Sequence, residues 1–292
     1  MMHKVRVIAR REWGLLLSSR AFRLGLLLPT AIVVGLMIYF GGQMRAAAAR
    51  VPQEAAAAAG AGHAMPNFVS MGAAYLFVML MFVGIMVLSQ YLLTNLIEEK
   101  SSRVVEVLLS AVSPFELMSG KILGLTAAGL EVGACAVVIG VVAMLEGFIG
   151  ALNPWALALF LVYYVLGTLL ISSMYAAVGS ACNTLREAQG MMLPMAMLFI
   201  VPLGGWMYFV QHPNGMAATL LSFVPPLTPM VMILRLAASK EVPVWQIALS
   251  VLVLGASVPA MMWAAAKIFR TGVLMYGKPP KLREMVKWLR YK

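Results

Sequence analysis

Six apolar segments, each close to the length needed to cross a lipid bilayer, constrain this chain more than any other feature. A membrane-spanning helix needs about 20 mainly apolar residues. The segments cover residues 24–40, 68–93, 122–142, 153–180, 191–209 and 242–269. Charged residues make up only 11% of the 292 residues, against about 25% in soluble domains. The pattern therefore predicts an all-α integral membrane protein and excludes a water-soluble globular domain, a disordered chain and an outer-membrane barrel of short alternating strands.

The distribution of positive charge predicts how these spans are oriented. The chain has 22 Lys and Arg residues and 11 acidic residues, all of them glutamate. If both termini are cytoplasmic, as six crossings allow, all of these cations except Arg45, Arg50, Arg235 and Lys240 lie on the cytoplasmic side, as the positive-inside rule requires. We therefore expect a multi-pass protein of the plasma (cytoplasmic or inner) membrane with cytoplasmic N- and C-termini. Its basic excess then reflects topology and lipid contact, not nucleic-acid binding.

The segments outside the spans have distinct compositions. Residues 1–23 alternate apolar and basic side chains at roughly helical spacing, which predicts a cytoplasmic amphipathic helix at the membrane interface. Residues 24–270 then form the six-span domain, and residues 271–292 form a basic cytoplasmic tail. A cleaved signal peptide is the alternative for the N-terminus, because small residues follow the first apolar segment; the basic region before it is longer than in such signals. Residues 46–62 form an Ala-rich external stretch that is too simple to build a core.

The connector after the second span is the most informative stretch of the sequence. Glu99 and Arg103 are four residues apart with the acid first, the favourable order for a helical ion pair. Polar and apolar side chains then gather on separate faces, which predicts one amphipathic helix that ends before Ser113. Ser113 and Glu116 match a capping box, with Pro114 at the first position of the next helix. The residues alone leave two interpretations open: a helix resting on lipid, or a helix presented to a cytoplasmic partner.

The connector between the fifth and sixth spans has a different pattern. Its apolar runs, residues 216–224 and 230–238, are too short to cross a membrane, and three prolines lie between them at Pro225, Pro226 and Pro229. Proline breaks helices, and broken helices within a membrane are tolerated only where protein or a cavity satisfies the freed backbone groups. We predict a re-entrant helical hairpin at the outer leaflet. A hydrophobic surface loop is the alternative.

The sequence lacks the motifs that enzymes of several classes need. It has no phosphate-binding G-x-x-x-x-G-K-[ST] loop, no H-E-x-x-H zinc motif and no aspartate, so we expect no catalytic residue, metal site or cofactor in this chain. Glu131 lies within the third span, where a carboxylate is normally turned to the bundle interior and is a candidate for a substrate or ion pathway. A structural hydrogen bond is equally compatible with it. An ion-gradient-driven carrier using Glu131 and a non-transporting membrane assembly or regulatory protein therefore stay open as alternatives.

Four blocks of the sequence resemble a known family. They are residues 98–110 with 113–117 and 120–121, residues 186–189 with Pro194, residues 225–230, and residues 276–284. In these blocks the chain resembles the type-2 ABC exporter permeases, in particular the sodium-efflux-like branch. The likeness extends over nearly the whole chain and implies the same six-span layout.

The resemblance implies a permease subunit of an ATP-driven ABC exporter, which works with two separate ATPase subunits that hold ATP and Mg and with a second copy or a related permease. The family's coupling helix follows the second span. The residues assigned to the ATPase interface are thus Glu98, Glu99, Lys100, Ser102, Arg103, Glu106, Ser113 and Glu116. Substrate would leave between two permeases past an outer gate at Pro225, Pro226 and Pro229. Many relatives carry a folded external domain where this chain has residues 46–62, so sodium is not carried over, and drug, lipid, peptide and ion stay open as substrates.

Overall fold

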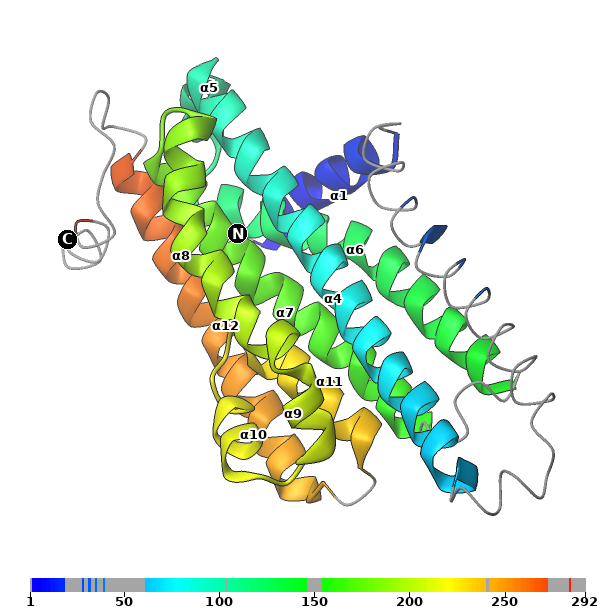
Figure 1. The fold of residues 1–292 in the computed structure, drawn as a ribbon. Helices are drawn as coiled ribbons and strands as arrows, with labels where there is room; N and C mark the ends of the chain where they lie inside the picture. The colour runs from blue at the N-terminus through cyan, green and yellow to red at the C-terminus, as the bar shows by residue number, and fades with distance from the viewer. Residues whose placement is uncertain are drawn as a thin grey trace.

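The protein is helical throughout the part of the chain that its computed structural model describes (Figure 1). That part comprises residues 2–18, 61–102, 104–145, 154–239 and 242–272, with isolated positions at 28, 31, 32, 35, 39 and 284. The predicted first span at residues 24–40, most of the Ala-rich stretch and nearly all of the basic tail lie outside these residues.

Five helices are long and apolar enough to cross a membrane. They are α4 (Ala61–Ser101), α6 (Pro114–Leu145), α7 (Pro154–Ala181), α8 (Leu185–Gly204) and α12 (Val244–Gly272). These helices contain or overlap the predicted second to sixth spans, which confirms an all-helical, multi-pass architecture. Since the predicted first span lies outside the described residues, the six-span layout stays a prediction.

Two helices extend beyond the apolar spans that the sequence predicted. α4 continues to Ser101 instead of ending near residue 93, so it carries charged residues past its apolar part. α8 begins at Leu185 instead of residue 191, because Thr184 caps it by accepting a hydrogen bond from the backbone N–H of Glu187. It ends at Gly204, and the short α9 (Trp206–Gln211) follows after a break at Gly205.

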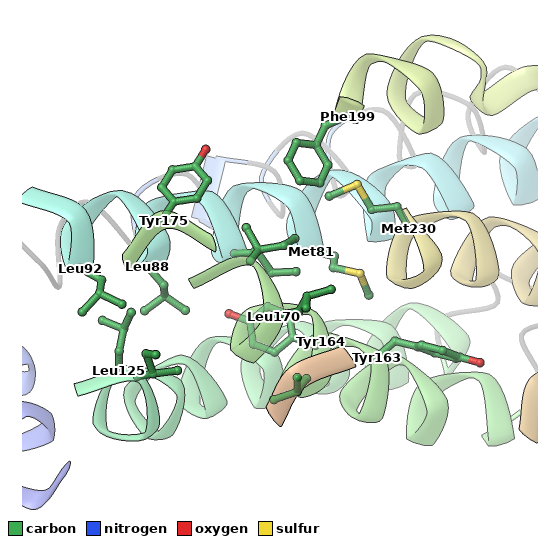
Figure 2. Close-up of a cluster of buried hydrophobic side chains, with 14 of the residues drawn as sticks. Met81, Leu88, Leu92, Leu125, Tyr163, Tyr164, Leu170, Tyr175, Phe199 and Met230 are labelled. Atoms are coloured by element: carbon green, nitrogen blue, oxygen red, sulfur yellow. The ribbon is translucent and has the colours of Figure 1, made fainter. Parts of the chain in front are cut away.

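The core lies around α7, which packs against α4, α6 and α12. Leu88 and Leu92 of α4, Leu125 of α6, and Tyr164 and Leu170 of α7 are all buried there (Figure 2). A buried hydrogen bond of 3.1 Å between the hydroxyl groups of Ser89 and Ser172 also joins α4 to α7. Helix association within a membrane depends on such close packing and interhelical hydrogen bonds, since lipid offers apolar surface of its own.

Short helices lie at opposite ends of this bundle: α5 (Val104–Ala111) at one end, and α10 (Met216–Leu221) with α9 at the other (Figure 1). The predicted pair of short helices on either side of the prolines is present as α10 and α11 (Thr228–Ala238). Residues 228–235 of α11 are all buried. Pro229 packs against Gly167 of α7, where an added Cβ would lie 2.9 Å from the proline ring, so α11 is held within the bundle.

The N-terminal helix α1 (Met2–Ser18) packs against α6. Two glycines one turn apart on α6 permit the approach. A Cβ at Gly120 would lie 2.7 Å from the Ile8 side chain, and one at Gly124 would lie 2.5 Å from the carbonyl oxygen of Ala9. This is the small-residue spacing that brings helix backbones together in membranes. The predicted amphipathic helix therefore exists, and protein contacts hold one of its faces.

Candidate functional site

The connector after α4 is built from two helical segments instead of the single amphipathic helix that the sequence predicted. The hydroxyl groups of Ser101 and Ser102 both donate to the carbonyl oxygen of Glu98, at 2.8 and 2.9 Å. Serine side chains compete in this way with the backbone bonds that would continue a helix. α4 therefore ends at Ser101, and the chain turns before α5 begins at Val104.

The capping box predicted at the start of α6 is confirmed. The backbone N–H and the hydroxyl of Ser113 both donate to Oε2 of Glu116 at 3.0 Å, and the N–H of Glu116 donates to the Ser113 hydroxyl at 3.3 Å. Pro114 is the first residue of α6. Ser113 and Glu116 thus fix the turn between α5 and α6, and Glu116 is largely buried in doing so.

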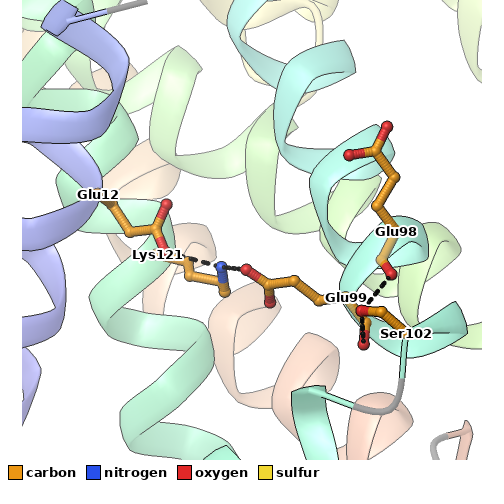
Figure 3. A network of polar contacts seen from close by, with 5 residues as sticks. All are labelled: Glu12, Glu98, Glu99, Ser102 and Lys121. Carbon is orange, nitrogen blue, oxygen red and sulfur yellow. Dashed lines mark hydrogen bonds and ion pairs between the residues drawn. The ribbon is translucent and has the colours of Figure 1, made fainter.

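A buried ion-pair cluster lies beneath α5 and joins three helices (Figure 3). The ammonium group of Lys121 on α6 lies 2.8 Å from Oε1 of Glu12 on α1 and 2.6 Å from Oε1 of Glu99 on α4. Only 1% of the Lys121 side chain is exposed. A cation this deeply buried needs hydrogen-bond acceptors or opposite charges around it, and two carboxylates from separate helices supply both here. The cluster therefore ties α1 and α4 to α6.

The ion pair that the sequence predicted between Glu99 and Arg103 stays a prediction. Arg103, the expected partner of Glu99, lies outside the described residues, and the partner that the structure assigns to Glu99 is Lys121. Sequence reasoning missed Glu12 altogether. It is the single acidic residue among the first 23 residues, and that isolation among basic neighbours was the available signal.

Two further lysines hold helix ends near α5. Lys100 is buried, and its ammonium group donates to the carbonyl oxygens of Ser180 and Cys182, at 3.3 and 3.4 Å, where α7 ends. Lys4 of α1 donates to the carbonyl oxygen of Ala111, the last residue of α5, at 2.9 Å. Cations are favourable at helix C-termini, where unpaired carbonyl groups carry partial negative charge. Lys100, predicted as an interface residue, thus has a structural contact, and α1 holds the far end of α5.

The residues that remain exposed here form one surface, called the α5 surface below. It consists of Glu98 and Ser102 from the end of α4 with Val104, Glu106 and Val107 from α5. Val107 is 72% exposed, and Val104 is also exposed. Two exposed valines set among polar side chains at this end of the bundle make the α5 surface a candidate contact site.

The other predicted site residues lie away from the α5 surface. Glu131 lies on an exposed face of α6, beside Leu130 and in line with Val138, and does not point into the interior of the described bundle. Pro225 and Pro226 are half-buried in the turn between α10 and α11, at the opposite end from α5. Within the described part of the chain, no group of three or more His, Cys or Glu side chains could hold a metal ion.

Comparisons with known proteins place this architecture in a family. Residues 41–267 match the family described as ABC-2 family transporter protein. The chain is 30% identical to the protein MJ1024 of Methanocaldococcus jannaschii over 212 residues, which are 72% of this chain and 52% of MJ1024. It is 25% identical to the protein YhaP of Bacillus subtilis over 236 residues, 76% of this chain and 56% of YhaP. The chain spans about half the length of these curated relatives. The family match covers most of the sequence and its five apolar helices, and the chain is therefore a multi-pass membrane protein that belongs to the ABC-2 family of transporter proteins.

Proposed function

We propose that this chain is the permease subunit of an ATP-driven ABC exporter, which moves a substrate out across the cytoplasmic membrane with energy from separate ATPase subunits. Membership of the ABC-2 family supports a role in transport. The observation that carries the proposal is the α5 surface, an exposed, partly apolar helix set at one end of the bundle above a buried ion-pair cluster.

The contacts around α5 suit it to pass movement from a soluble partner into the membrane. Its far end is held by Lys4 of α1, and its connection to α6 is fixed by the Ser113–Glu116 capping box. Beneath it, Lys121 joins α6 to Glu99 at the end of α4. A displacement of α5 by an ATPase subunit would therefore reach α4 and α6 together, because the links between them are short.

The proposal extends to the layout of the assembly. Residues 24–40 would be the first of six spans, and both termini and the α5 end would be cytoplasmic. α1 with its basic residues lies near α5, and so does the end of α12, since Gly272 lies close to the Ser180 carbonyl group; this charge distribution supports the orientation. Two ATPase subunits and a second permease copy, or a related permease, would complete an exporter of the sodium-efflux-like branch.

The opposite end would then face outward. We assign residues 213–238, called the outer hairpin below, to a re-entrant outer gate with Pro225 and Pro226 in its turn. Pro229 anchors this hairpin against α7. Glu131 would face the translocation path between two permeases, because a carboxylate on an otherwise apolar, exposed helix face needs a polar neighbour within a membrane.

A pair of valine substitutions tests the site of coupling. Val107 on α5 is 72% exposed, and Val244 at the opposite end of the bundle is 79% exposed, so Val107→Glu and Val244→Glu make the same change at two equally accessible positions. We expect tagged wild-type protein and Val244→Glu, purified from native membranes in mild detergent, to bring down an ATP-hydrolysing subunit, and Val107→Glu to lose it.

The outcomes of this experiment separate the alternatives. If wild-type protein brings down no ATP-hydrolysing subunit, even after cross-linking from Ser101 or Ser102, the exporter proposal fails. If Val107→Glu retains the subunit as well as Val244→Glu does, the docking site lies elsewhere. ATP-independent flux that collapses in Glu131→Gln would instead identify an ion-gradient-driven carrier.

A further inference from the structure

Arg235, near the end of α11, is a fully buried cation at the end of the bundle opposite α5, with 0% of the residue exposed. Its Nε group donates to the carbonyl oxygen of Pro213 at 2.6 Å, and Nη1 donates to the hydroxyl of Ser222 at 2.8 Å. Its Nη2 group donates to Oδ1 of Asn214 at 3.4 Å and to Oε1 of Gln246 at 2.5 Å. A contact of 3.6 Å from Nη1 to the Met232 sulfur completes the set.

These contacts make Arg235 the junction of three segments. Pro213 and Asn214 belong to the loop before α10, Ser222 follows the last residue of α10, and Gln246 lies in the first turn of α12. A guanidinium group has five N–H donors in a rigid fork, and each has an acceptor here. One side chain therefore closes the outer hairpin on itself and fastens it to α12.

Every acceptor of Arg235 is electrically neutral, and no carboxylate of a described residue pairs with it. A glutamate at position 246 would be stabilised by the positive end of the α12 dipole and by an ion pair with the guanidinium. The chain has glutamine there. The outer hairpin is thus fastened by several hydrogen bonds from one guanidinium and by no ion pair with a described residue, so this contact can open without separating two opposite charges.

We propose that Arg235 and Gln246 form a releasable latch, which holds the outer hairpin against α12 in the resting transporter and opens during each cycle of ATP hydrolysis. This inference rests on the proposed function, in which the outer hairpin is the outer gate. Arg235 is a positioning residue in this account: opening removes its contact with Gln246 while its bonds to Pro213 and Ser222 keep the hairpin folded.

The substitution Gln246→Glu separates a latch from a merely structural contact. The carboxylate strengthens the bond to Arg235, so the thermal midpoint of the complex should rise by about 3 °C. The outer hairpin should then separate from α12 less often. The matched control is Gln189→Glu, which makes the same change at an exposed position near the start of α8. If the bond has only a structural role, Gln246→Glu raises stability and leaves opening unchanged.

The opening of the outer hairpin is measured as the accessibility of position 218, because Ala218 is buried within the closed hairpin. Ala218→Cys is placed in a chain whose Cys135 and Cys182 are replaced by alanine, within the complete complex in sealed vesicles, and is probed with a membrane-impermeant maleimide from the outer side. We expect labelling to accelerate when ATP is hydrolysed, and Gln246→Glu to reduce that acceleration about ten-fold, since a carboxylate should hold the guanidinium more tightly than a neutral amide oxygen by roughly that factor.

Three results would overturn the latch. Labelling that is equally fast with and without ATP, in a complex that contains its ATPase subunits, refutes the latch and leaves the proposed function standing. Labelling that accelerates equally in Gln246→Glu and in Gln189→Glu refutes the role of the Arg235–Gln246 bond. A complex that contains no ATP-hydrolysing subunit refutes the proposed function itself, and the latch with it.

Discussion

Lys121 and Arg235 are buried to the same extent at opposite ends of one bundle, and the protein satisfies them in different ways. Lys121, near α5, lies between the carboxylates of Glu12 and Glu99. Arg235, in the outer hairpin, donates to carbonyl, hydroxyl and amide oxygens and to no described carboxylate. The two sites show that burial alone does not determine which groups satisfy a cation: one is paired with carboxylates and the other with neutral oxygens.

The difference matches the parts that the two ends play in the proposed transport cycle. Losing one partner of a buried ion pair leaves an uncompensated charge, which is strongly destabilising. The three helices that meet at Lys121 should therefore move as a unit when α5 is displaced. The acceptors of Arg235 are neutral, so opening its contact with Gln246 separates no pair of opposite charges, and we expect this contact to open while the α5 end keeps its shape.

The largest effect should come from Lys121→Met, which leaves Glu12 and Glu99 without their cation. We expect a loss of about 3 kcal/mol in the free energy of unfolding, at the lower end for buried pairs because a fifth of the Glu99 side chain is exposed. Thermal unfolding of the purified protein in detergent measures it. Lys267→Met is the control, since Lys267 is only half-buried, over the Trp263 ring on α12. Equal losses in the two variants would show that the ion-pair cluster does not join the helices.

Arg235→Met should cost less than Lys121→Met, because it leaves neutral acceptors behind and no buried charge. Several hydrogen bonds are lost, and we expect a destabilisation of about 2 kcal/mol in the same unfolding measurement. A loss of stability greater than that of Lys121→Met would show that Arg235, and not Lys121, holds its end of the bundle more firmly.

The packing of α1 against Gly124 of α6 offers a further way to destabilise the end of the bundle that carries α5. Gly124→Ala places a methyl group 2.5 Å from the Ala9 carbonyl oxygen and 2.9 Å from Cβ of Glu12, so α1 must shift away and stretch the Glu12–Lys121 pair. We expect a loss of about 1.5 kcal/mol and faster proteolysis of α1. Gly14→Ala, which meets no atom within 4 Å, is the matched change on α1 itself and should leave both unaltered. Rapid proteolysis of both variants would contradict the docked position of α1.

We expect the smallest loss of stability where the outer hairpin packs against α7. Gly167→Ala brings a methyl group 2.9 Å from the ring of Pro229, and overpacking of this kind should cost about 1 kcal/mol. Gly255→Ala in α12 is the control, because no atom lies within 4 Å of the added methyl group. If thermal unfolding shows no difference between these variants, Pro229 does not anchor the hairpin in the way the structure indicates.

The helices of the bundle could be predicted because a membrane leaves few choices for an apolar segment. Backbone groups must be satisfied within each span, so apolar segments such as residues 153–180 become helices such as α7 almost residue for residue. The Ser113–Glu116 capping box was predictable for a similar reason, since its hydrogen bonds are local. Helix ends were harder to predict. The start of α8, for example, is set by the cap at Thr184, which lies outside the apolar pattern.

The candidate site could be predicted only in part, because its main contacts join residues far apart in the sequence. The position of the connector was evident, but the partner of Glu99 is 22 residues away, on another helix. Glu12 is 109 residues from Lys121, and no local pattern indicates that they meet. The burial of Arg235 was also unexpected, since the charge rule placed this residue on the external side of the membrane. Its acceptors come together only when the outer hairpin is folded.

Site-specific photo-cross-linking is the sharpest test of the proposal that an ATP-hydrolysing subunit docks on the α5 surface. A photo-reactive residue is placed at position 107 on α5 or at position 216 on α10, both of which are exposed in the structure. We expect irradiation of native membranes to capture an ATP-hydrolysing subunit from position 107 and none from position 216. Capture from position 216, or from neither position in membranes where the chain is intact, would contradict it.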